Sequence, residues 1–320
     1  MKAVITIIGF CFFLNSLAVH AVPPHTLVDA VQTGLTSDLA RELTNIQDPA
    51  VLNEPIDDSK TTLMHFTARR GLLDKMILLL KAGAKIDLTD AEGKTPLHWA
   101  AQAGAFPPIH ELLKNGSDPA ARDHHQRTPI HFVVNAGDIR SLHALLLASR
   151  KSDMHIGGVH PGDVNLGDKG GFTPLHIATL RGFSAVVHHL LNAGANPLLR
   201  TTAPSRICTS SKELCLPAGT SALHLAALLG QPTIINQLLE MPGVGVTDLD
   251  DDENTPFHLA LREGHFAGAV LLLGRGSSLI AINRGGQTAY SLALTRGHIE
   301  TVELLNKLQV PPTERSMTED

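Results

Sequence analysis

The chain has 320 residues, of which 43% are hydrophobic, and a formal net charge of −5 at pH 7. This length suits either two ordinary domains or one elongated domain. A weakly acidic chain lacks the general basic field on which non-specific nucleic-acid binding depends, so no nucleic-acid partner is expected.

The first residues have the pattern of a secretory signal peptide. Lys2 precedes an apolar run from Ala3 to Leu14, and polar and small residues follow as far as Ala21, which is the order of an export signal. The apolar run is about a dozen residues, whereas a membrane-spanning helix needs roughly 20. Residues 1–21 are therefore predicted to be a signal peptide that is cut after Ala21, the alternative being an uncleaved membrane anchor. We expect a periplasmic or secreted protein with no stable membrane insertion.

A short phrase that starts with Thr or Ser, and in most copies ends with His, returns along the rest of the chain. The copies start at Thr62, Thr95, Thr128, Thr173, Ser221, Thr255 and Thr288, so four of the six intervals are 33 or 34 residues. Thr or Ser is expected to cap a helix, and the Pro that follows it in several copies suits the first helical position. A Gly ends this helix, and a second helix with paired leucines follows.

This period and the phrase Thr-Pro-Leu-His resemble the ankyrin-repeat family. The resemblance covers roughly residues 57 to 308 and implies an all-α fold, a solenoid of helix-turn-helix units joined by short β-hairpin-like turns. No single unit can bury its own apolar face, so the units are expected to stack into one elongated domain. Residues 22–56 are interpreted as an N-terminal capping repeat, 57–310 as the repeat domain of about seven units, and 311–320 as a disordered tail. A monomer is expected.

The two long intervals contain insertions near residues 150–160 and 201–216. Cys208 and Cys215, the only cysteines after the predicted signal, lie in the second insertion. An even pair of nearby cysteines in an exported chain predicts a disulfide, with two free thiols as the alternative.

Histidine is frequent, with 18 copies, but most copies have a scaffold explanation. The repeat phrase places six of them, which are expected to hydrogen-bond the capping Thr and nearby backbone: His65, His98, His131, His176, His224 and His258. In the first insertion, His155 and His160 could join a zinc site with His124 or His125, since imidazole is a good zinc ligand. No compact ligand spacing supports that site, so neither a metal nor another cofactor is predicted.

Catalysis is not supported by the sequence. It contains no nucleophile elbow, P-loop or dinucleotide-binding glycine pattern, and no motif ties Ser, His and Asp into one arrangement. The chain is therefore predicted not to be an enzyme.

The resemblance implies that a protein partner binds on the concave face, which the turn tips and the residue pair before each helix-ending Gly would form. The candidate partner-binding residues at these positions are Arg69, Arg70, Arg127, Lys169, Phe172, Arg181, Leu228, Leu229, Arg262 and Arg296. Five of the arginines recur at the pair position, so stacking is expected to align them as a broken basic ribbon. Phe172 and the two leucines are expected to add an apolar patch near its middle, a combination suited to a binding hot spot. The alternative is a normally solvated face of mixed charge.

The leading hypothesis is thus an exported, non-catalytic protein-interaction module that uses its concave face and inserted loops. An alternative is a secreted bacterial effector that recruits a host protein. A weaker alternative is a metal-dependent enzyme that uses the insertion histidines.

Overall fold

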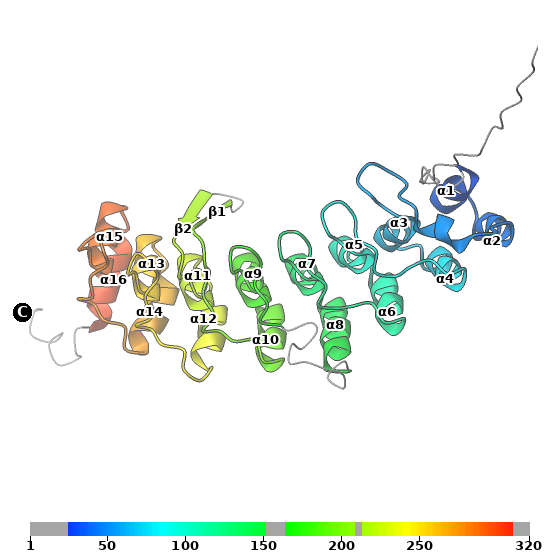
Figure 1. The fold of residues 1–320 in the computed structure, drawn as a ribbon. Coiled ribbons are helices and arrows are strands. Elements are labelled where there is room, and N and C mark those ends of the chain that lie inside the picture. The colour runs from blue at the N-terminus through cyan, green and yellow to red at the C-terminus, as the bar shows by residue number, and fades with distance from the viewer. Residues whose placement is uncertain (1–24, 152–163, 209–212, 310–320) are drawn as a thin grey trace, which may run out of the picture.

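The computed structural model describes residues 25–151, 164–208 and 213–309, which form eight pairs of α-helices, a short 3-10 helix at Pro49–Asn53 and a two-stranded sheet. The first helices of the pairs are α1 (His25–Gln32), α3 (Leu63–Arg70), α5 (Pro96–Ala103), α7 (Pro129–Ala136), α9 (Pro174–Arg181), α11 (Ala222–Leu228), α13 (Pro256–Arg262) and α15 (Ala289–Thr295). The second helices are α2 (Thr36–Thr44), α4 (Leu73–Lys81), α6 (Phe106–Lys114), α8 (Ile139–Lys151), α10 (Ser184–Asn192), α12 (Pro232–Leu239), α14 (Phe266–Gly274) and α16 (Ile299–Gln309). Figure 1 shows two stacked rows, with turn tips projecting beyond the row of first helices.

Capping residues set the first and last residues of the helices. Thr95 is the N-cap of α5 and forms a capping box with His98, while Pro96 occupies the first helical position without the loss of a hydrogen bond. Gly104 ends this helix at φ 66°, a left-handed conformation that glycine adopts without a Cβ clash. The same cap and stop recur in the other repeats, and the all-α solenoid predicted from the sequence is confirmed.

One apolar core runs the length of the stack. Leucines of the second helices such as Leu79, Leu112 and Leu190 are fully buried, and the same cluster extends from Leu27 in α1 to Val302 in α16. Small residues such as Ala100 and Ala101 on the first helices are completely buried as well. Because each unit buries its apolar face only against its neighbours, the solenoid is a single folding domain in the described residues.

A buried lysine fastens the first helix pair to the next. The Lys75 side chain on α4 is only 7% exposed, and its Nζ donates hydrogen bonds to the carbonyls of Ala30, Val31 and Gly34 at 2.9, 2.8 and 2.7 Å. These carbonyls end α1, where a helix has unsatisfied acceptors and negative dipole charge. The sequence alone did not predict this contact.

The second insertion forms a β-hairpin, where only a loop was expected. Strands β1 (Ser205–Cys208) and β2 (Glu213–Leu216) pair antiparallel and lie beside the turn tips near α11 (Figure 1). The backbone register pairs Cys208 with Glu213 and Cys215 with Arg206, so the two cysteines are diagonal neighbours. Diagonal Cα atoms lie roughly 7–8 Å apart, beyond the usual disulfide range of about 4.4–6.8 Å. The disulfide stays a prediction.

Several predictions concern parts of the chain outside the described residues. These are the signal peptide at 1–21, most of the first insertion including His155 and His160, and the tail at 311–320. Within residues 25–151, 164–208 and 213–309, no helix combines the length and apolar character needed to cross a bilayer.

Candidate protein-binding surface

An aspartate at a constant position builds the turn tips. Asp90 lies five residues before the capping Thr95, and its Oδ1 accepts hydrogen bonds from the backbone N–H groups of Glu92 and Lys94 at 2.9 and 2.8 Å. Asp123 does the same for His125 and Arg127 at 2.9 and 2.8 Å. A carboxylate that accepts bonds from N–H groups two and four residues ahead closes a tight turn. The recurrence of Asp five residues before most of the capping threonines is the sequence signal for this role.

Neighbouring tips are joined through their backbones. The N–H of Ala91 donates to the carbonyl of Ser59 at 2.8 Å, that of His124 to Glu92 at 2.9 Å, and that of Lys169 to His125 at 3.0 Å. Similar bonds join the later tips, including Arg284 to Asp252 at 3.0 Å. The tips therefore form an ordered surface, and their side chains are held in a fixed spacing.

Five of the six phrase histidines connect their unit to the next, the exception being His176. In α7 the N–H of Thr128 donates to Nδ1 of His131 at 3.1 Å, and the His131 Nε2 lies 3.1 Å from the carbonyl of Phe172 in the next unit. Because Nδ1 accepts and Nε2 faces a carbonyl, the ring is neutral with its proton on Nε2. His65 and His98 contact the carbonyls of Lys94 and Arg127 in the same way, at 2.9 and 3.0 Å. The scaffold interpretation of these histidines agrees with the structure, which adds the contact between units.

Burial shifts the acid–base behaviour of these histidines. Removal from water lowers the pKa of His131, His176 and His224 to about 4 and also lowers the pKa of His65, His98 and His258, because burial penalises the charged ring. The rings are therefore neutral at pH 7.

A cluster of cations and aromatic rings occupies the N-terminal part of the face formed by the first helices and the tips, here called the inner face. Phe66, Trp99 and Phe132 each directly follow a phrase histidine and are half-buried. The Arg69 guanidinium lies 5.1 Å from the Trp99 ring and that of Arg70 lies 5.6 Å from the Phe66 ring. Such cation–aromatic contacts are favourable and hold the guanidinium planes in place.

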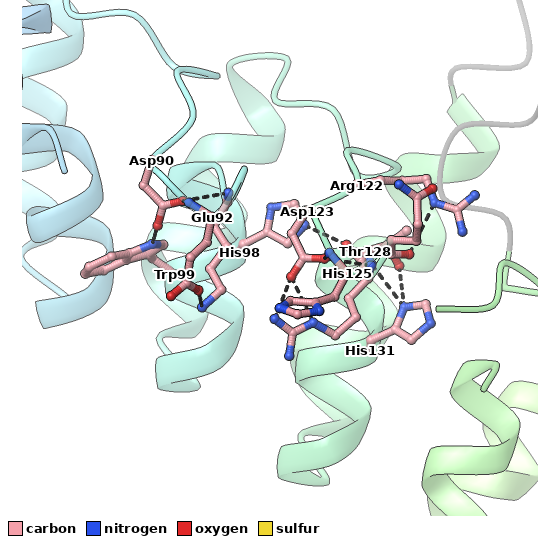
Figure 2. Close-up of polar contacts among 12 residues, drawn as sticks. Asp90, Glu92, His98, Trp99, Arg122, Asp123, His125, Thr128 and His131 are labelled. Atoms are coloured by element: carbon pink, nitrogen blue, oxygen red, sulfur yellow. Dashed lines mark hydrogen bonds and ion pairs between the residues drawn. The ribbon is translucent and has the colours of Figure 1, made fainter. Parts of the chain in front are cut away.

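The carboxylates that build the tips also orient this cluster. The second oxygen of Asp90 accepts a hydrogen bond from the Trp99 indole at 2.8 Å, and that of Asp123 lies 2.6 Å from an Arg127 guanidinium nitrogen; Figure 2 shows both carboxylates between tip and helix. Arg127 in turn lies 4.6 Å from the Phe132 ring. The positive charge of Arg127 is thus neutralised within the protein.

Two arginines of the cluster are left to solvent. Arg69 and Arg70 are exposed, and among the described residues no carboxylate lies within ion-pair distance of either one. With Phe66 and Ala103 they line a surface cavity of about 420 Å³. Lys94 differs, because its Nζ lies 2.7 Å from a Glu92 carboxylate oxygen.

The prediction of an exposed apolar patch at the middle of the face is wrong. Phe172 is only 8% exposed and Leu228 only 2%, and both pack with Leu216, Leu225 and Leu259 into a small second core. The physical reason is the hairpin, because Leu216 at its end is itself buried in this cluster. Leu229 is half-buried against the same cluster. Neither Phe172 nor Leu228 is available as a surface anchor.

The other candidate residues separate into different environments. Arg181 is exposed and donates a hydrogen bond from Nε to the Asn135 side chain of the preceding unit at 2.8 Å, and Lys169 is exposed at a tip. Arg262 is partly buried and lies 3.2 Å from the Glu263 carboxylate. Arg262, Arg284 and Arg296 line a second cavity of about 450 Å³. The buried cluster around Leu228 lies in the unit between Arg181 and Arg262, so it interrupts the predicted series of arginines.

Most of the chain matches a known family of repeat proteins. A family model described as ankyrin repeats (3 copies) matches residues 27–123, 106–201 and 223–313. A homolog of transient receptor potential cation channel subfamily A member 1 from Caenorhabditis elegans is 31% identical over 142 residues, which are 44% of this chain and 10% of that protein. Rabankyrin-5 from Mus musculus is 30% identical over 147 residues, 40% of this chain and 12% of that protein. The matches thus span only about a tenth of those relatives.

Two solved structures share the fold. The ankyrin repeat domain of Bcl-3 superposes with a TM-score of 0.60 at 21% identity and covers 78% of this chain and 100% of that one. The human ASB11 ankyrin repeat domain gives a TM-score of 0.59 at 23% identity, with 79% and 100% covered. At this identity the likeness concerns the fold alone.

Proposed function

Because the chain belongs to the ankyrin-repeat family, we propose that it is a non-catalytic protein-interaction module that binds an acidic segment of a protein partner on its inner face. The observation that carries the proposal is the pair of exposed arginines, Arg69 and Arg70, held beside half-buried Trp99 and Phe66 without a carboxylate partner in the described residues. Fold alone does not define a partner, so the proposal depends on this site.

The chemistry of the two arginines favours a carboxylate-rich partner. A guanidinium presents several N–H donors in a planar fork that matches a carboxylate, and it is weakly hydrated, so its desolvation on binding costs less than that of an ammonium group. The aromatic neighbours already restrict the side chains, which reduces the entropy lost on binding. Aromatic and arginine side chains together are also the typical composition of binding hot spots.

Reversing both charges, in Arg69→Glu/Arg70→Glu, is expected to lower the association rate with a captured partner roughly tenfold and to flatten its dependence on salt. The partner is first isolated by pull-down with the mature chain and mass spectrometry, and binding is then measured at several salt concentrations. Thermal melts should change little, because both side chains are exposed.

The matched control is Arg41→Glu/Lys114→Glu, which makes the same change in net charge on exposed side chains of second helices, away from the inner face. This control should bind nearly as well as the unmodified chain. Equal binding by both double variants, with normal melts, would place the partner elsewhere.

We further propose that the protein is exported and acts in the periplasm or outside the cell as a monomer. The support is the order of Lys2, the short apolar run and the small residues up to Ala21. The cysteine pair at 208 and 215 is compatible with an oxidising compartment.

Intact-mass analysis of protein exported by its own host is expected to show a chain that starts at Val22, because the predicted cut follows Ala21. The same measurement without reductant should find the mass lower by two hydrogen atoms if Cys208 and Cys215 are joined. Retention of Met1 together with membrane association would support an uncleaved anchor instead.

A further inference from the structure

Two histidine rings meet on the outer surface of the solenoid, between the second helices α8 and α10. The Nε2 atom of His143 lies 3.2 Å from the Nδ1 atom of His189. The ring centroids are 4.6 Å apart and the ring planes are nearly perpendicular, at 87°. The His143 side chain is exposed and His189 is half-buried, so solvent reaches the two nitrogens.

The distance fits two ligands of one metal ion. Zinc binds imidazole nitrogen at about 2.0–2.1 Å with tetrahedral angles, which places two ligand nitrogens of one ion roughly 3.3–3.4 Å apart. The observed separation of 3.2 Å between the two nitrogens is close to that value. We propose that His143 and His189 form a surface binding site for one divalent transition-metal ion of the zinc class, with water completing the coordination.

Among the described residues, the charged groups and rings nearest to the pair do not occupy the space between His143 and His189. Arg140 on α8 lies 5.2 Å from the Phe106 ring of α6, so its charge is directed to the side away from α10. The His188 ring is 6.0 Å from that of His189, and its Nε2 lies 3.0 Å from the Asn192 side-chain nitrogen. No group of three metal-binding side chains occurs in the described residues, so the site is a two-histidine site, which suits a borderline ion such as zinc or copper.

The site joins the two units between which the first insertion interrupts the repeat. His143 and His189 are 46 residues apart, and their nitrogens meet only when α8 and α10 lie side by side. An ion that binds both histidines stabilises the side-by-side arrangement of the two helices by mass action. The ion would therefore act as a clamp between two repeats.

Zinc alone is the probe. Isothermal titration of the unmodified chain with zinc at pH 7.5 should show one site. In His143→Asn and in His189→Asn the affinity for zinc should fall at least about tenfold. Zinc should also raise the melting temperature of the unmodified chain but not of either variant. Binding should weaken on acidification to about pH 5.5, because protons compete for the imidazole ligands.

His110→Asn is the matched control, because His110 occupies in α6 the position of His143 in α8, while Ala144 takes in the next helix the place of His189. It should bind zinc like the unmodified chain, as should His155→Asn/His160→Asn. Zinc binding that survives the loss of His143 or His189 would overturn the proposal, as would its loss in either control. If the unmodified chain binds no zinc, the proposal is wrong and the contact is only a hydrogen bond between two rings.

Discussion

Between pH 7 and pH 5 the repeat domain is expected to lose on the order of 6 kcal/mol of unfolding free energy through three buried histidines. Burial lowers the pKa of His131, His176 and His224 to about 4 in the folded chain, compared with about 6.5 when unfolded. Below pH 6.5 the unfolded chain therefore binds protons that the folded chain does not. The stability is fully present above pH 6.5 and falls as the pH drops toward 4, by about 2 kcal/mol per histidine at pH 5.

The same direction holds for His65, His98 and His258, whose pKa values are also lowered by burial. The carboxyl groups of Asp87 and Asp250 act in the opposite direction, because burial raises their pKa, but their usual value near 4 places their titration at the acid end of this window.

Urea unfolding followed by circular dichroism at pH 7, 6 and 5 measures the effect. The slope of the free energy against pH near pH 5 should correspond to at least roughly two to three protons taken up on unfolding. His131→Gln should reduce that uptake by about one proton, although it also weakens the cap of α7. A free energy that stays constant from pH 7 to pH 5 would show that these rings are not held neutral by the fold.

Replacing Lys75 with Met is expected to cost about 3 kcal/mol or more and to release the first helix pair. The substitution keeps the aliphatic stem but leaves the carbonyls of Ala30, Val31 and Gly34 without their donor, and each buried acceptor left unsatisfied costs about 1–3 kcal/mol. In a repeat stack the loss should remain local, because each unit contacts only its neighbours.

Hydrogen exchange resolves the location of the change. Amides of α1 and α2 should lose protection in Lys75→Met, while those of α11 to α16 should keep it. Lys81→Met, at the exposed end of the same helix α4, is the control and should change stability by less than about 0.5 kcal/mol. Equal protection of α1 in both variants would mean that Lys75 does not hold the first helix pair in place.

Much of the molecule followed from the sequence, because the determinants of the repeat are local. A capping Thr, the Pro after it and the helix-ending Gly act within a few residues, so Thr95, Pro96 and Gly104 could be assigned from their spacing alone. The scaffold role of the phrase histidines followed in the same way, since Thr128 and His131 are three residues apart. Stacking was also predictable, because no unit buries its own leucines.

Only the tertiary structure decided which residues of different units, or on either side of an insertion, contact each other. The hairpin at 205–216 buried Phe172 and Leu228, which a repeat alignment alone had placed on the surface. Stacking left Arg69 and Arg70 without a carboxylate, and only packing directs Lys75 to the end of α1. The periodic pattern determines which side chains share a face, whereas their neighbours across units depend on how the helices pack.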